Sequence, residues 1–145
     1  MAVLFFLFAF AFQSFGQQFN NAAQLDSGLK IQLKAPKKRI NDKKSFPRAD
    51  YMFNKKTHQI IWIAVWPYDS FGVYNFFFID TALVKIRLYK TLSKSLPIQR
   101  GVYYFQNGKL IDKNEFNLAP QNIDEILKLS STYFLKSKMF YPKRN

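Results

Sequence analysis

Short apolar runs separated by turn residues fill the middle of the chain, residues 51–112. The run at 59–66 is apolar on both faces, which is typical of a central strand covered on both sides. Polar residues at 55–58 separate it from the run at 51–54, which predicts a hairpin with its tip at 55–58. No helical pattern alternates with these runs, so they favour an antiparallel sheet over a parallel one.

The β pattern continues beyond this hairpin. Residues 73–79 form another apolar, aromatic run. Apolar residues that alternate with Lys85 and Arg87 then predict a strand over 82–88 with one face in water.

The dipeptide Asn107-Gly108 lies between two further apolar runs, 102–106 and 109–112. Both residues tolerate the positive φ that a type I′ turn needs, so this segment predicts a two-residue hairpin. The expected register places Phe105 opposite Leu110 and Tyr104 opposite Ile111.

A helix is expected at the C-terminal end. Asn122 and Glu125 have the spacing of a capping box, and Pro120 lies just upstream. Apolar residues then recur at helical spacing: Ile123, Ile126, Leu127, Tyr133 and Phe134. Strands first and a helix last predict an α+β fold, an antiparallel meander of about five to six strands with the helix packed on one face.

The domain is expected to begin near residue 29. Residues 17–28 are polar and predict a loose leader. Leu29, Ile31 and Leu33 then alternate with polar residues, which predicts a first strand that Pro36 ends. The chain is therefore divided into 1–16, 17–28 and a single small α+β domain at 29–145.

Residues 1–16 have the pattern of a signal peptide. An apolar run without charge from 2 to 12 is too short to cross a bilayer, which takes about 20 residues. Ser14 and Gly16 stand two apart, as small residues do before a cleavage site, although no Lys or Arg precedes the apolar run. Cleavage is expected near Gly16/Gln17, followed by export to the periplasm or the medium, with no transmembrane span in the mature chain.

The chain is strongly basic, with a formal net charge of +13 and no cysteine. Such a charge favours anionic partners. For an exported protein, the expected partner is an anionic envelope surface or a glycan, and nucleic acid is not expected. The most basic stretch, 37–48, has few apolar residues and predicts an exposed loop. Its candidate anion-binding residues are Lys37, Lys38, Arg39, Lys43, Lys44 and Arg48.

The aromatic residues are a second candidate site. Trp62 and Trp66 are four apart on an expected strand, so their side chains should share a face. Together with Tyr103 and Tyr104 they would form a platform on which sugars or bases stack. The alternative is that all four belong to the hydrophobic core.

Little in the sequence indicates an enzyme. His58 is the single histidine and lies in an expected turn, and no known nucleophile, metal-binding or nucleotide-binding motif is present. Asp69 and Asp80 flank an aromatic run and could approach each other across a hairpin as a catalytic pair, but they fit turn and strand ends better. We therefore expect no catalytic residue, no cofactor and no metal.

Two functions fit these observations best. The first is a small exported, non-enzymatic protein that binds an anionic or glycan partner through its basic residues. The alternative is an accessory subunit that docks on another envelope protein through an apolar, aromatic face of the sheet.

Overall fold

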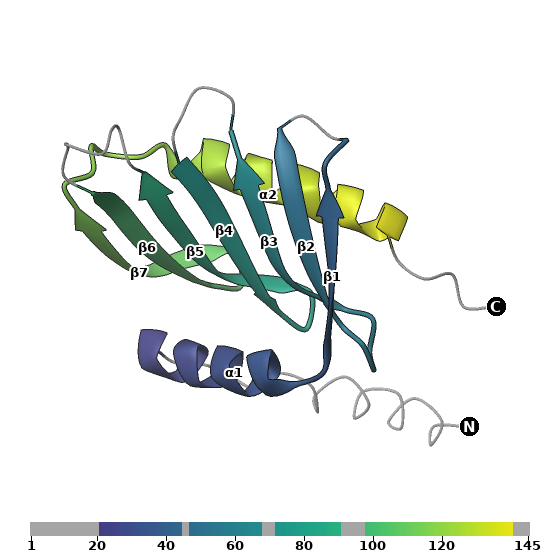
Figure 1. Ribbon diagram of the computed structural model, residues 1–145. Helices are drawn as coiled ribbons and strands as arrows, with labels where there is room; N and C mark the ends of the chain where they lie inside the picture. The colour runs from purple at the N-terminus through teal and green to yellow at the C-terminus, as the bar shows by residue number, and fades with distance from the viewer. Residues whose placement is uncertain (1–20, 45–46, 68–71, 91–97, 141–145) are drawn as a thin grey trace, which may run out of the picture.

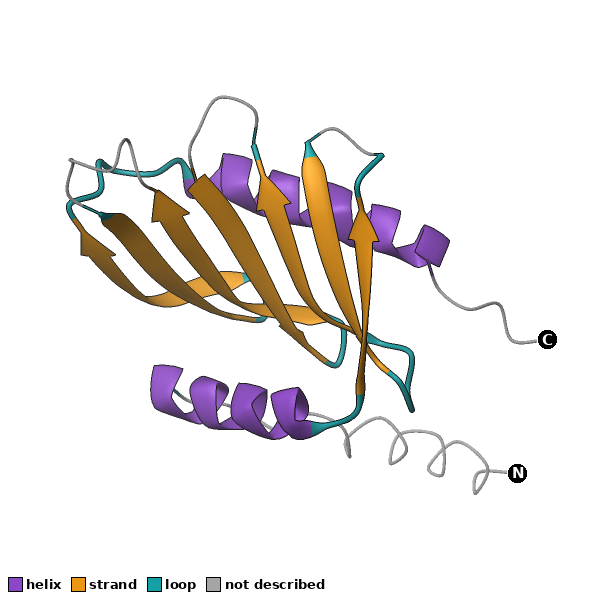
Figure 2. Cartoon of the chain, viewed as in Figure 1, coloured by secondary structure: helices purple, strands orange, loops and turns teal. Residues whose placement is uncertain are grey.

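The computed structural model describes residues 21–44, 47–67, 72–90 and 98–140. Within them, seven strands form one antiparallel sheet in which neighbours in space are neighbours in sequence. Helices α1 and α2 lie on opposite sides of this sheet (Figure 1), and Figure 2 shows the same two layers around the strands. The elements are α1 (Ala22–Lys34), β1 (Lys37–Asp42), β2 (Arg48–Asn54), β3 (Ile60–Trp66), β4 (Gly72–Ile79), β5 (Ala82–Lys90), β6 (Gln99–Gln106), β7 (Lys109–Phe116), α2 (Ile123–Ser137) and the 3-10 turn η1 (Lys138–Phe140).

The predicted α+β class is confirmed, with one more strand than the upper end of the prediction and a second helix. The main core lies between the sheet and α2. Tyr51, Phe76 and Phe105 are almost fully buried there, and the Phe78 ring lies 5.2 Å from that of Phe134 on α2. Burial of each such side chain contributes about 1.5–3 kcal/mol.

Helix α2 forms where the capping signal predicted it. The side chain of Asn122 accepts a hydrogen bond from the backbone N–H of Glu125 at 3.3 Å. Acidic residues occupy the first turn and Lys136 the last, so both ends match the helix dipole.

The two hairpins are also present, but one register differs from the prediction. Asn107 and Gly108 both have positive φ, and Phe105 pairs with Leu110 as expected. Tyr104 pairs with Asp112 instead of Ile111, because the register shifts by one residue between Tyr104 and Phe105.

The prediction for the N-terminal part of the domain is wrong. Residues 22–28 are helical and not a loose leader, and Leu29, Ile31 and Leu33 belong to the same helix and not to a strand. Asn21 caps the helix by accepting a hydrogen bond from Gln24 N at 2.9 Å. The expected signal peptide, 1–16, lies outside the described residues.

The basic stretch 37–48 is not simply a loop, because its first half is edge strand β1, paired with β2. Ile40 packs against the core beneath α2, while its neighbours Arg39 and Asn41 are exposed. Charged side chains suit an edge strand because they discourage pairing with another chain. Lys43 and Lys44 follow the strand as an exposed connection.

Candidate functional site

The sheet face on the α1 side carries a band of arginines and aromatic rings. Residues directly opposite one another in an antiparallel pair share a face, so the pairs Arg48–Trp66 and Tyr89–Arg100 lie on this side. We call the band the arginine–aromatic face; its residues are Arg39, Arg48, Asp50, Trp62, Trp66, Asn75, Phe77, Arg87, Tyr89, Arg100 and Phe116.

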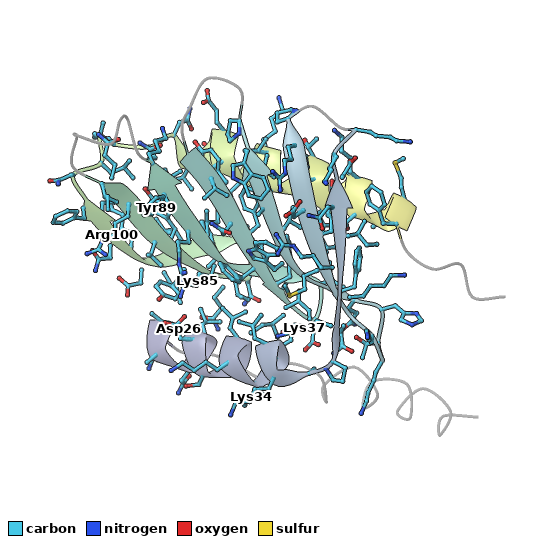
Figure 3. All side chains as sticks on the ribbon, viewed as in Figure 1. Asp26, Lys34, Lys37, Lys85, Tyr89 and Arg100 are labelled. Carbon is cyan, nitrogen blue, oxygen red and sulfur yellow. The ribbon has the colours of Figure 1, made fainter. Side chains whose placement is uncertain are left out.

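Helix α1 covers the part of this side near the β4–β5 turn. Leu25 and Leu29 pack there on Val84, with Phe77 and Tyr104 beside them. Figure 1 shows α1 along the lower edge of the near side of the sheet, with α2 behind it. Tyr89 and Arg100 lie away from α1 on the same near side (Figure 3), and both are exposed. Within the described part of the chain, the four arginines, Tyr89 and Phe116 of this face are exposed, whereas its tryptophans are partly buried.

Each arginine of this face lies over an aromatic ring. The Cζ of Arg48 is 4.7 Å from the Trp66 ring centroid, and that of Arg39 is 5.6 Å from Trp62. The other two distances are 5.1 Å from Arg100 to Phe116 and 5.8 Å from Arg87 to Phe77. All four lie within the roughly 6 Å range of cation–π attraction. Four planar guanidinium groups are thus held against rings on one surface.

A buried carboxylate anchors two of these arginines. Asp50 is fully buried, and its Oδ2 lies 2.5 Å from Nη2 of Arg39 and 3.7 Å from Nη2 of Arg48. Its Oδ1 is buried and has no hydrogen-bond partner among the described residues. A buried polar group that is only half satisfied is costly, and such groups concentrate at functional sites.

The two tryptophans are held in place by their neighbours. Trp62 Nε1 donates a hydrogen bond to Asn75 Oδ1 at 3.0 Å. Fully buried Ala64 lies between Trp62 and Trp66 on the same face of β3. The rings therefore flank a small residue, and each has an arginine beside it.

The structure separates the six predicted anion-binding residues. Arg39 and Arg48 belong to the arginine–aromatic face, whereas Lys38 points to the other side of β1 and is exposed. Lys37 donates a hydrogen bond to Leu33 O near the C-terminal end of α1. Lys43 and Lys44 are exposed and lie between β1 and β2.

The four predicted platform residues do not form one surface. Trp62 and Trp66 share a face as expected, but Tyr103 is fully buried on the α2 side, where its hydroxyl donates to Glu115 at 2.8 Å. Tyr104 lies on the α1 side, and its hydroxyl donates to Asp26 Oδ2 at 2.8 Å. Adjacent strand residues point to opposite faces, so Tyr103 and Tyr104 are separated by the sheet.

Sequence reasoning missed six residues of the face: Asp50, Asn75, Phe77, Tyr89, Arg100 and Phe116. The strand predicted over 82–88 placed Arg87 on its solvent-exposed face, but the contact of Arg87 with the Phe77 ring was not predicted. The missed residues lie on different strands. The register of the whole sheet determines that their side chains are neighbours on one face.

Asp26 attaches α1 to the sheet through a buried lysine. Lys85 Nζ lies 2.6 Å from Asp26 Oδ1, and the Lys85 side chain is 9% exposed. Figure 3 shows Asp26 and Lys85 facing each other between α1 and the strands. Burial acts to raise the pKa of Asp26, but hydrogen bonds from Lys85 and Tyr104 outweigh it and the pKa is lowered. Burial and the bond to Asp26 raise the pKa of Tyr104 to about 12.

A lowered pKa makes the stabilising effect of Asp26 dependent on pH. The ionised carboxylate stabilises the fold above its unfolded pKa of 3.8, and this contribution is lost as the pH falls through the lower folded value. We therefore expect Asp26→Asn to lower the free energy of unfolding at pH 7 and to have little effect near pH 2. Urea unfolding of both proteins at the two pH values measures this, and an equal difference at both would contradict it.

The described residues show no catalytic constellation. His58 lies in the β2–β3 turn with positive φ, and Asp80 is exposed in the β4–β5 turn; Asp69 lies outside the described residues. No group of three or more His, Cys, Asp or Glu side chains among the described residues could hold a metal ion. The chemistry available on the arginine–aromatic face is thus binding through charge and stacking.

The apolar aromatic face required by the docking hypothesis packs beneath α2, with Tyr51, Phe76 and Phe105 buried. None of the helices in the described part of the chain is long and apolar enough to cross a membrane.

Comparison with models of known protein families, with curated proteins and with solved structures finds no match.

Proposed function

We propose that this chain is an exported, non-enzymatic protein that binds an anionic glycan on its arginine–aromatic face. The observation that carries the proposal is the set of four guanidinium groups lying over aromatic rings on one exposed face of the sheet. The apolar run at residues 2–12 supports export, and the formal charge of +13 supports an anionic partner.

The chemistry of the face suits carboxylate or sulfate groups on a sugar chain. A guanidinium group presents a planar fork that binds such groups through two parallel hydrogen bonds. Contact with an aromatic ring restricts the arginine before binding, so less conformational entropy is lost when the ligand arrives. Among the residues that make up the face, the acidic one is Asp50, which is fully buried and paired with Arg39. Exposed Asp112 lies on the same side of the sheet opposite Tyr104, and the four arginines outnumber it.

The size of the face favours a polymer over a single sugar. Arg48 lies on β2 and Arg100 on β6, four strand spacings apart. At roughly 4.8 Å per spacing the two arginines are on the order of 20 Å apart. A ligand that contacts both ends must therefore extend across several strands.

Salt-dependent retention on a heparin matrix tests the proposal. Arg87→Gln/Arg100→Gln removes two exposed charges of the face. We expect on the order of tenfold weaker binding, because charge-assisted hydrogen bonds contribute about 1.5–3 kcal/mol in favourable geometry. The double variant should elute at clearly lower salt than the unaltered protein.

The matched control is Lys43→Gln/Lys44→Gln, which removes the same charge from an exposed connection outside the face. This control should elute near the unaltered protein. Equal losses in the two double variants would show binding by net charge alone, and absence of retention at low salt would contradict the proposal.

A further inference from the structure

A pocket of about 550 Å³ lies on the other side of the sheet, between α2 and the ends of β4, β5 and β6. Its walls include Phe78, Phe105 and Leu83 from the sheet, and Leu127, Ser130 and Phe134 from α2. It lies near the β4–β5 and β6–β7 turns, and the sheet separates it from the arginine–aromatic face.

The pocket exists because small residues occupy positions where larger ones would fill the space. Ser130 is 2% exposed and stands four residues after Ile126 on the buried side of α2. Gly108 is at the rim, where a Cβ would meet no atom within 4 Å. A leucine at position 130 would project into the pocket towards the sheet.

The walls select an apolar ligand. No residue lining the pocket is charged, and most of them are aliphatic or aromatic. The Ser131 hydroxyl already donates to Leu127 O at 3.0 Å. With so few polar groups available to orient a ring system, the pocket fits a flexible apolar chain better than a polar small molecule.

The length and volume of the pocket agree with an alkyl chain of medium length. The lining runs along α2 from Leu127 to Leu135, a rise of about 12 Å at 1.5 Å per residue. The volume falls within the roughly 300–1,000 Å³ typical of small-molecule sites. Exposed Lys128 stands three residues before Ser131 on α2, so one positive charge borders the apolar walls.

We propose that this pocket binds the alkyl chain of an amphiphile whose carboxylate or phosphate head group stays at the rim. A free fatty acid and a membrane phospholipid share this chemistry. The site is on the opposite side of the sheet from the glycan face, so either proposal can fail without the other.

Displacement of a fluorescent apolar probe, phenyl-naphthylamine, by laurate tests the pocket in the full chain. We expect saturable probe binding that laurate reverses. Ser130→Leu should weaken probe and laurate binding at least tenfold, since the new side chain fills the pocket. Ser130→Ala, which keeps the space, should bind within about twofold of the unaltered protein.

Thr132→Leu is the matched control, because position 132 is exposed on α2 and does not line the pocket. It should bind as the unaltered protein does, and thermal unfolding should show that each variant is folded. A second arm uses phosphatidylglycerol vesicles: lipid recovered with the protein identifies a phospholipid source, and displacement by laurate alone identifies a free fatty acid. No saturable binding, or equal binding by folded Ser130→Leu, would overturn the proposal.

Discussion

Arg39→Met is expected to lower the free energy of unfolding by about 3 kcal/mol, because it leaves a buried charge without its closest partner. Asp50 is fully buried, and among the described residues Arg48 at 3.7 Å and Asn41 at 3.5 Å would remain near its Oδ2 after the substitution. The methionine keeps most of the apolar contact with Trp62, so the loss reports mainly on the charge. Denaturant unfolding of the two proteins measures it.

A double-mutant cycle separates the charge from the packing. In Asp50→Asn/Arg39→Met the buried group is neutral, so the double variant should be more stable than Arg39→Met alone. Lys38→Met is the control on the same strand, since Lys38 is exposed and points to the other side, and it should change stability by less than about 0.5 kcal/mol. If Arg39→Met costs no more than Lys38→Met, Asp50 does not anchor the arginine–aromatic face.

Leu29→Ala should cost about 3 kcal/mol, the range seen when a buried leucine is truncated in a packed core. Leu29 is 4% exposed and packs with Leu25 against Val84, and these contacts hold α1 on the sheet. Loss of the leucine leaves a cavity beneath the helix. Thermal or denaturant unfolding of the variant gives the difference directly.

Ile31→Ala distinguishes the helix from the strand that the alternation predicts. In a strand, residues 29 and 31 would lie on one face and both truncations would be costly. In α1 the Ile31 side chain is 72% exposed, so its truncation should cost less than about 0.5 kcal/mol. Equal losses at 29 and 31 would contradict the helix.

The parts of the fold that local signals specify could be predicted from the sequence. The Asn107-Gly108 turn, the cap at Asn122 and the long apolar run of β3 each act over a few residues. Helix α1 was missed because Leu29, Ile31 and Leu33 alternate with polar residues, which is the pattern of a strand. The buried residues Leu25 and Leu29 are four apart, as in a helix, and Asn21 caps that helix. Strand β1 was missed because its charges resemble a loop, although an edge strand needs only one partner.

The site could be predicted only in part. The shared face of Trp62 and Trp66 follows from their spacing, and the same rule separates Tyr103 from Tyr104, which the platform hypothesis overlooked. Which arginine meets which ring depends on the register of six strand pairs, and three of these pairings contain irregularities. Asp50 gives no local signal, because its partners Arg39 and Asn41 lie on the neighbouring strand β1.

The most direct measurement is an NMR titration with a heparin-derived oligosaccharide, followed through the two tryptophan indole N–H signals. The chain contains only two tryptophans, and both lie on the arginine–aromatic face. Binding there predicts saturable shifts of one or both signals, together with the amides of Arg87 and Arg100, and their reversal by salt. Unshifted indole signals, with changes confined to the amides of Lys43 and Lys44, would contradict the assignment of glycan binding to this face.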